Sequence, residues 1–485
     1  MLYNKIFNLI LLLISIFLLF CLLQTLIPYP VHWDSILYIR ALDYFDISGS
    51  QPQAPGYIFY IVATKIIFFI IREPFWSYIL LNYLSFIFLI FLMKKYTERY
   101  QISINIIYSI LFSSPIFLYY INQVRPYIFV CLLFNIILYL FYICFREKRF
   151  LLFSSLLLGI SGGVRQQDMV LLLPLYIFIL YYSSFKKIYK LLGIGLFFIG
   201  ICLWFIPLFI ISGGILSYFK TVSELLFSHT VKIPLTHNFG MLIIGFFTLT
   251  PVGFFILFLD IYTKIRTTAS FFKKLEIKND IIFWGILFMP ALIFYLFVHL
   301  NDAGYMLWLF IPISVYLSSI ISNYKTRVKK IISFIVFIPG ICYYLFVPSH
   351  YSFAFINRIS KLQIRMTEYI KLNYGTDTVI IGDENYYFGF INLTYFLPRY
   401  RVFHIDEVYK KCTPSFYRRP LGTQIFSEKY KRTGTIYIPE STRNIIFTFN
   451  PLDYKKDISS SFNQITFDPK YLSVYILHLI RVGAV

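Results

Sequence analysis

The chain has 485 residues, of which 58% are hydrophobic and 14% are charged, and its formal net charge is +21. Soluble domains carry about 25% charged residues, so this composition excludes an ordinary soluble protein. Apolar runs of the length that crosses a bilayer, about 20 residues, recur along the chain. The basic residues cluster in short segments between these runs. We therefore attribute much of the positive charge to membrane topology and predict no nucleic-acid partner.

About eleven apolar runs predict an α-helical polytopic membrane protein. The first, residues 6–26, is too long for a signal-peptide core and lacks a small-residue cleavage site. We therefore interpret it as a membrane helix. The later runs lie at residues 75–93, 104–120, 127–144, 150–163, 169–183, 191–211, 238–259, 281–298, 306–322 and 331–347.

The stretch at residues 57–71 is apolar but short, contains Lys65 and is closed by Arg72-Glu73-Pro74. We interpret it as an interfacial helix on the outer face. With this interpretation, the basic clusters between the spans all lie inside; a full span here would place the later clusters outside. We therefore predict a protein of the cytoplasmic membrane. By the positive-inside rule, its N-terminus lies in the cytoplasm and residues 28–56 lie on the outer side.

From Pro348 onward the chain becomes polar and charged, and helical periodicity alternates with strand-like runs. This pattern predicts a small α/β domain. The predicted helices are residues 360–374 and 393–397, and the predicted strands are residues 378–383, 401–405, 435–439 and 445–449. We divide the chain into a transmembrane domain, residues 1–347, and an extracytoplasmic domain, residues 348–485. The first outer loop with its interfacial helices, residues 28–74, is assigned to the transmembrane domain.

The first outer loop carries Asp34, Arg40, Asp43 and Asp46 between flanks that are almost uncharged. In a helix over this stretch, Arg40 and Asp43 are three residues apart and can form an ion pair. Asp34 lies nearly opposite Asp43 and has no paired base nearby in the sequence, which suits a general base. The structural alternative is that Asp34 caps the helix N-terminus.

Two arginines stand at the outer ends of spans, where a charge is costly and marks a functional candidate. Arg125 follows Asn122-Gln123-Val124, and Arg165 follows Gly162-Gly163-Val164 in a break between two short apolar runs. Arginine binds phosphate through a bidentate fork, so this pair suits a lipid-linked phosphate. Snorkelling to lipid headgroups is the alternative, and it has more force for Arg125.

His299, Asp302 and Tyr305 form a third outer polar cluster. Together with Tyr57, at the end of the first outer loop, they are candidates for substrate binding. An ordinary polar loop is the alternative. The other outer histidines are scattered without the spacing of zinc ligands, so no metal site is predicted.

Three segments of the first outer loop carry a family resemblance: Trp33-Asp34-Ser35, the hexapeptide 41–46, and Gln51-Pro52-Gln53-Ala54-Pro55-Gly56-Tyr57. They resemble the first outer loop of GT-C glycosyltransferases, in particular the bacterial family 39-like group of lipid A aminoarabinose transferases and protein O-mannosyltransferases. There an acidic residue opens the loop, and a His-Pro-Pro-like element precedes an interfacial helix. This chain departs from the pattern at Gln53-Ala54 and at Ser35, where the group usually has a second acidic residue.

The resemblance covers roughly residues 1–347. Gly163-Val164-Arg165 is similar to the segment whose basic residue binds donor phosphate in that group. Gly304-Tyr305, followed by residues 309–312, is similar to a late outer loop and span.

The resemblance implies that a hexosyl or pentosyl group moves, with inversion, from a polyprenyl-phosphate donor to a lipid, glycan or protein acceptor at the outer face of the cytoplasmic membrane. Asp34 would be the general base, with Asp43 as the second catalytic candidate, and Arg165 and Arg125 would bind the phosphate. The implied partners are the lipid-linked donor, the acceptor and membrane lipids, with no metal or other cofactor.

Two other functions remain open from the sequence. A transporter or flippase of a lipid-linked glycan would need paired broken helices, usually in related halves. Residues 161–168 form one break, and the second half shows no counterpart. A polysaccharide polymerase or ligase would use the same donors and is still a transferase.

Overall fold

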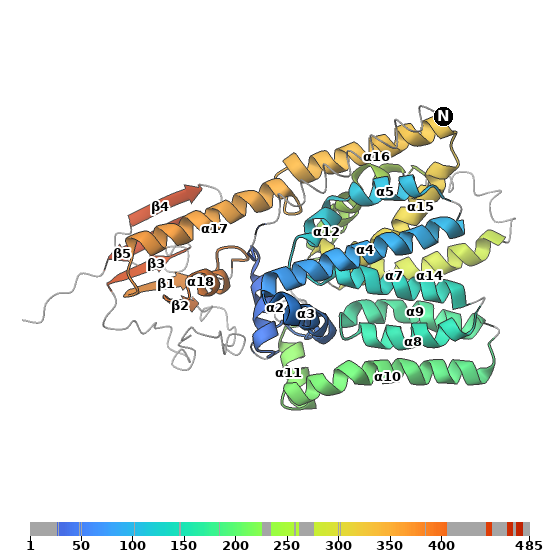
Figure 1. Cartoon of the computed structure of the whole chain (residues 1–485), viewed down its shortest axis with the longest axis horizontal. Helices are drawn as coiled ribbons and strands as arrows, with labels where there is room; N and C mark the ends of the chain where they lie inside the picture. Colours follow the sequence, from blue (N-terminus) through green and yellow to red (C-terminus); the bar gives the residue numbers. More distant parts are fainter. Residues whose placement is uncertain are drawn as a thin grey trace, which may run out of the picture. The chain divides into compact units, whose positions relative to one another are not determined.

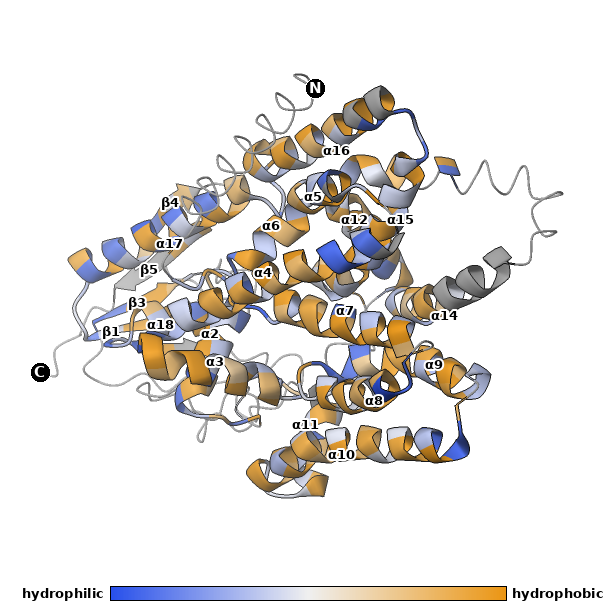
Figure 2. Ribbon diagram, turned by 45° about the vertical axis from the view of Figure 1, so that its right-hand side comes forward, coloured by the Kyte–Doolittle hydropathy of each residue, from blue (hydrophilic) through white to orange (hydrophobic). Residues whose placement is uncertain are grey.

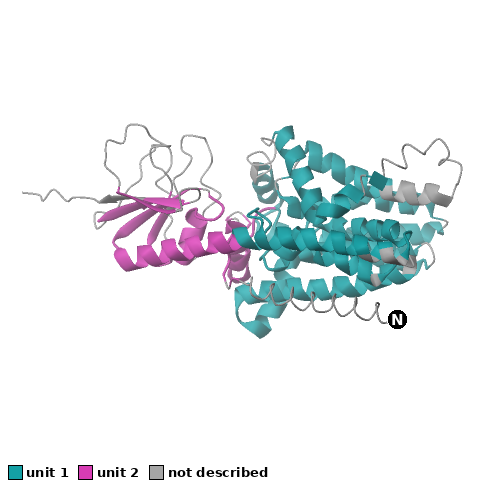
Figure 3. Ribbon diagram, turned by 90° about the horizontal axis from the view of Figure 1, so that it is seen from above, with its two compact units in different colours: residues 1–26, 55–355 teal, residues 27–54, 356–485 magenta. Residues whose placement is uncertain are grey.

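The sequence folds into a helical unit and an α/β unit in the computed structural model (Figure 3). Unit 1 comprises residues 1–26 and 55–355, and unit 2 comprises residues 27–54 and 356–485. The structure describes residues 27, 29–47, 49, 51–100, 102–144, 147–183, 185–225, 234–256, 259–260, 276–298, 300, 302–383, 385–404, 443–448, 463–468 and 472–478. The predicted span at 6–26 and the predicted strand at 435–439 lie outside these residues.

Unit 1 is built from apolar helices (Figure 2), and many of them expose hydrophobic side chains. The segments long and apolar enough to cross a membrane are Pro74–Glu98, Tyr127–Cys144, Lys187–Ile211 and Ala303–Ser322, and shorter apolar helices accompany them. The described helices are α3 (Ile58–Ile71), α4 (Pro74–Tyr100), α5 (Ile104–Phe112), α6 (Pro115–Ile121), α7 (Tyr127–Cys144), α8 (Arg149–Ser161), α9 (Gln166–Tyr182), α10 (Lys187–Ile211), α11 (Ile215–Leu225), α12 (Leu235–Leu249), α14 (Glu276–Phe297), η3 (Ala303–Leu309), α15 (Phe310–Ser322) and α16 (Thr326–Phe346). This arrangement confirms the predicted polytopic helical membrane protein.

Proline and glycine set two breaks in these helices. The run at 104–120, predicted as one helix, is divided into α5 and α6. Ser114 has an extended backbone, with ψ 107°, because Pro115 disfavours a helical conformation in the residue before it. The break predicted before Arg165 is confirmed, since α8 ends at Ser161 and α9 begins at Gln166. Helix α8 lies beside α10 (Figure 1), and it also packs against α7.

Unit 2 holds a five-stranded sheet with the strand order β2-β1-β3-β5-β4. The strands are β1 (Thr378–Gly382), β2 (Arg401–His404), β3 (Asn444–Phe447), β4 (Asn463–Asp468) and β5 (Leu472–His478), and the helices of this region are α17 (Phe353–Asn373) and α18 (Phe390–Phe396). Strand β1 runs parallel to β2 and β3, whereas β5 is antiparallel to its neighbours. Helix α18 connects β1 to β2, as a parallel pair requires a crossover. The α/β character predicted for this region is confirmed.

The start of the first outer loop belongs to unit 2. Its helix α2 (Trp33–Asp43) buries most of its residues and packs on α18. The observed grouping of residues 27–54 with the C-terminal region therefore differs from the predicted division, which assigned the whole loop to residues 1–347. The reason is tertiary: α2 buries apolar side chains such as Ile36 and Leu42, and the hydropathy of a segment does not identify its packing partner.

Candidate active site

Asp34 lies in the first turn of α2, where His32 is the N-cap. The Asp34 backbone N–H donates to Nδ1 of His32 at 3.1 Å. Because this nitrogen accepts a hydrogen bond, it carries no proton. The 3.9 Å approach of His32 Nδ1 to the Asp34 carboxylate is therefore not an ion pair. Since His32 occupies the cap position, Asp34 is not the N-cap, and the positive end of the helix stabilises its charge.

Gln53 orients the Asp34 carboxylate. Its amide Nε2 donates to Asp34 Oδ1 at 2.6 Å. A tight reversal brings it there, since Asp46 and Gln51 exchange backbone hydrogen bonds of 2.6 and 2.8 Å. An amide donor fixes the direction of a carboxylate without neutralising it. The Asp34 side chain is 13% exposed, so it is shielded but still reachable.

The predicted ion pair between Arg40 and Asp43 is wrong. Arg40 instead donates to Thr394 Oγ1 at 2.8 Å, and burial lowers the pKa of Arg40 to about 10. Asp43 is exposed at the C-terminal end of α2, and it forms no ion pair within the described part of the chain. Spacing permits the pair on a free helix, but α18 offers Arg40 a buried partner.

Arg165, in unit 1, is almost fully enclosed. Its Nη1 lies 2.9 Å from Asp168 Oδ2, and the two side chains are 2% and 0% exposed. Its Nη2 donates to Gln167 Oε1 at 3.2 Å. A guanidinium has five N–H donors, and Nε has no hydrogen-bond partner among the described residues. Arg165 is thus a desolvated cation that is held in place but keeps donors for an anion.

Aromatic rings flank this guanidinium. Its Cζ lies 4.0 Å from the ring centroid of Tyr305 and 5.5 Å from that of Tyr127, which are cation–π distances. Tyr305 is held in turn, because the hydroxyl of Tyr295 donates to its carbonyl oxygen at 2.6 Å. Sequence reasoning missed Asp168, although the spacing of three residues from Arg165 at a helix start was a usable signal.

Asp302 anchors the start of η3. Its carboxylate accepts hydrogen bonds from the hydroxyls of Tyr120, Tyr127 and Tyr351 and from the backbone N–H of Gly304. Tyr120, Tyr351 and Gly304 donate to Oδ1 and Tyr127 donates to Oδ2, so Asp302 organises the tyrosines around it. The Tyr127 side chain contacts both Asp302 and Arg165 and so joins the two clusters. His299, predicted beside them, lies outside the described residues.

The end of the first outer loop meets the break before α9. The Phe59 backbone N–H donates to the Gly163 carbonyl at 2.9 Å, and a Cβ on Gly163 would stand 2.4 Å from the Phe59 ring. Glycine is therefore required for this contact. Tyr57 has a left-handed backbone with φ 45°, and it interacts electrostatically with Arg165. Strain in a residue other than glycine is often found at functional sites.

Arg125 is buried, with 7% of its surface exposed, which disfavours the snorkelling alternative. It interacts electrostatically with Tyr127, as Arg165 does. Unit 1 thus brings together five of the predicted site residues: Tyr57, Arg125, Arg165, Asp302 and Tyr305. The two predicted catalytic carboxylates, Asp34 and Asp43, belong to unit 2.

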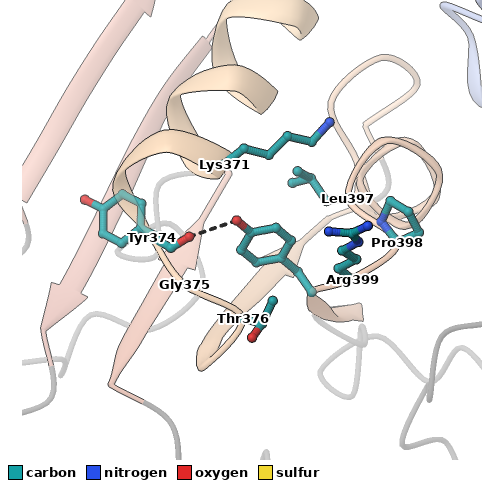
Figure 4. A pocket seen from close by; sticks show the side chains of 8 residues that line it. Lys371, Tyr374, Gly375, Thr376, Leu397, Pro398 and Arg399 are labelled. Atoms are coloured by element: carbon teal, nitrogen blue, oxygen red, sulfur yellow. Dashed lines mark hydrogen bonds between the residues drawn. The ribbon is translucent and has the colours of Figure 1, made fainter.

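A surface hollow of about 530 Å³ lies elsewhere in unit 2, between residues 371–376 and residues 397–400 (Figure 4). Lys371 and Arg399 contribute positive charge, and the hydroxyl of Tyr400 donates to the Tyr374 carbonyl at 2.8 Å. The lining includes none of the predicted site residues, so this hollow is separate from the candidate active site.

Comparisons with known proteins bear on the fold. No protein-family model matches the chain, and no curated protein matches it. Two solved structures are similar to it: ArnT from Cupriavidus metallidurans bound to undecaprenyl phosphate, which covers 97% of both chains, and the apo state of the same protein, which covers 98% of both. Each has 11% sequence identity and a TM-score of 0.58. Similarity at this level of identity shows the fold alone, and the chain has the fold of ArnT.

Proposed function

We propose that this protein is a membrane glycosyltransferase that moves a sugar from a polyprenyl-phosphate donor to an acceptor at the outer face of the cytoplasmic membrane. One observation carries the proposal: the fold of ArnT, which has been solved with undecaprenyl phosphate bound, extends over 97% of this chain. The site residues add the groups that such a reaction needs, namely a carboxylate base and cations for phosphate.

Asp34 is the base in this proposal. It takes the proton of an acceptor hydroxyl or amine while that oxygen or nitrogen attacks the anomeric carbon. The bond between the anomeric carbon and the phosphate oxygen breaks, and the configuration inverts. Gln53 holds one carboxylate oxygen at 2.6 Å, and Asp34 remains reachable for the acceptor. A general base contributes about 10²–10⁴-fold to a rate.

Arg165 stabilises the leaving phosphate. The charge on the phosphate oxygen grows as the bond to the sugar breaks, so a fixed cation in a water-poor environment acts on the transition state. Asp168 at 2.9 Å keeps the guanidinium in place, and the Tyr305 ring lies 4.0 Å from its Cζ. Arg125, which shares Tyr127 as an electrostatic neighbour, supplies the second positive charge.

The first test is lipid binding and sugar transfer by the purified full-length protein in nanodiscs. We expect undecaprenyl phosphate to bind and undecaprenol, which lacks the phosphate, to bind much more weakly. We also expect release of undecaprenyl phosphate from undecaprenyl-phosphate aminoarabinose or undecaprenyl-phosphate mannose when membrane lipids are supplied as acceptor. Equal binding of the two lipids, together with no release from either donor, would contradict the proposal.

A further inference from the structure

Two side chains from different helices of unit 2 converge on one backbone atom of the first outer loop. The Gln363 amide, on α17, donates to the Val31 carbonyl oxygen at 2.8 Å. The Asn392 amide, on α18, donates to the same oxygen at 3.0 Å. Val31 directly precedes the cap residue of α2, so both bonds act on the chain just before Asp34.

Further contacts hold the next two residues, His32 and Trp33. Gln363 also donates to the Tyr387 carbonyl, and the Trp33 backbone N–H donates to the Tyr386 carbonyl at 2.9 Å. His32 stacks on Tyr386, with ring centroids 5.2 Å apart and an interplanar angle of 23°. Since His32 in turn accepts from the Asp34 backbone, contacts lead without a gap from α17 to the carboxylate-bearing residue.

The far end of α2 is held by the same helix. Arg40 donates to Thr394 Oγ1 on α18, and Asn392 lies two residues earlier on that helix. The helix that carries Asp34 is therefore fixed at its start by Gln363 and Asn392 and near its end by Thr394. Rotation about its axis or sliding along it would break at least one of these bonds.

The two amides carry a cost in stability as well as a benefit. Gln363 and Asn392 are each 1% exposed, and their side-chain oxygens have no hydrogen-bond partner within the described ranges. Burying an unpaired amide oxygen is unfavourable. An apolar side chain would avoid that cost but would take these donors away from the Val31 carbonyl. What the amides provide is direction, because two donors specify the position of one carbonyl oxygen.

We propose that Gln363 and Asn392 are positioning residues that fix the angle of the Asp34 carboxylate, so that the C-terminal region is part of the catalytic machinery. The inference rests on the proposed function, in which Asp34 is the base. A positioning role differs from a purely structural one in its effect on the enzyme. The two amides affect turnover through Asp34, whereas binding of the donor phosphate does not depend on them.

Gln363→Met tests this, because methionine keeps the length of the side chain and removes its donors. We expect the turnover number to fall about 10²-fold, as a small misplacement of a catalytic group does, while the Kd for undecaprenyl phosphate stays unchanged. Hydrogen exchange at the Trp33 amide should become faster. The matched control is Thr367→Val on the same helix, since among the described residues the Thr367 hydroxyl bonds only carbonyls of α17. It should change neither property.

A double-mutant cycle separates positioning from general damage. In the Asp34→Asn background, Gln363→Met should have no further effect on turnover, because the group that it positions is already absent. Asn392→Leu should behave in the same way, and it replaces Gln363→Met if that variant does not fold. Additive losses in the cycle, or unchanged exchange at Trp33, would overturn the positioning role. An Asp34→Asn enzyme with full activity would overturn the proposed base itself. Faster hydrogen exchange at the Trp33 amide in Gln363→Met would still show that Gln363 holds the start of α2.

Discussion

Asp34 and Arg165 are held in opposite ways. Asp34 is partly exposed, and an uncharged amide orients it at 2.6 Å. Arg165 is enclosed, and a buried carboxylate holds it at 2.9 Å. A base must be reachable for its acceptor and keep its charge available, so a neutral donor suits it. A cation that stays in a water-poor region needs a counter-charge to remain there. The two environments match the two roles proposed for them.

The largest expected effect comes from Asp34, the partly exposed residue of the two. Asp34→Asn keeps the size of the side chain and can still accept from Gln53, but it cannot take a proton. Transfer at saturating donor should therefore slow by about 10²–10⁴-fold. Size-exclusion profiles check that the variant is folded. Near wild-type turnover of the folded variant would remove Asp34 from the mechanism and leave the fold assignment intact.

The environment of Arg165 is tested by removing one charge of the pair that it forms with Asp168. Asp168→Asn leaves the Arg165 charge buried without its counter-ion, and breaking such a pair by removing one partner costs about 3–5 kcal/mol of stability. Thermal unfolding in nanodiscs measures the loss. The double variant Arg165→Met with Asp168→Leu should regain much of this stability but not phosphate binding. If Asp168→Asn unfolds at the wild-type temperature, the pair does not hold this region.

These two sites also show what sequence can predict. The described apolar helices, apart from the division of residues 104–120, follow from local hydropathy, and the break before α9 follows from Gly162-Gly163, so these were predicted. Hydrogen-bond partners that lie far apart in the sequence were not predicted. Arg40 bonds Thr394, and Gln363 bonds Val31 across 332 positions. Such contacts depend on how elements pack, and no local periodicity records them. Asp168 is the intermediate case, since its spacing from Arg165 was visible but unused.

Phosphate binding gives the next effect. Arg165→Ala should weaken binding of undecaprenyl phosphate by about 1.5–3 kcal/mol, the value of a hydrogen bond to a charged group. Arg165→Lys should recover part of the loss, because the charge remains but the planar fork does not. Titration of the lipid into nanodiscs measures both. Unchanged affinity in a folded Arg165→Ala variant would move the phosphate to another cation, with Arg125 as the first candidate.

The smallest expected effect belongs to Asp43, where structure revises the sequence-based expectation. An ion pair with Arg40 would have made Asp43→Asn destabilising. Instead Asp43 is exposed at the C-terminal end of α2, where a negative charge opposes the helix dipole. The substitution should shift unfolding free energy by no more than about 0.5 kcal/mol, with turnover near the wild-type value. Parallel melting curves and transfer rates for Asp43→Asn and Asp34→Asn decide the matter. An inactive Asp43→Asn enzyme beside an active Asp34→Asn enzyme would transfer the role of base to the exposed carboxylate of Asp43. The uncharged hydrogen-bond donors around Asp34 would then need another explanation.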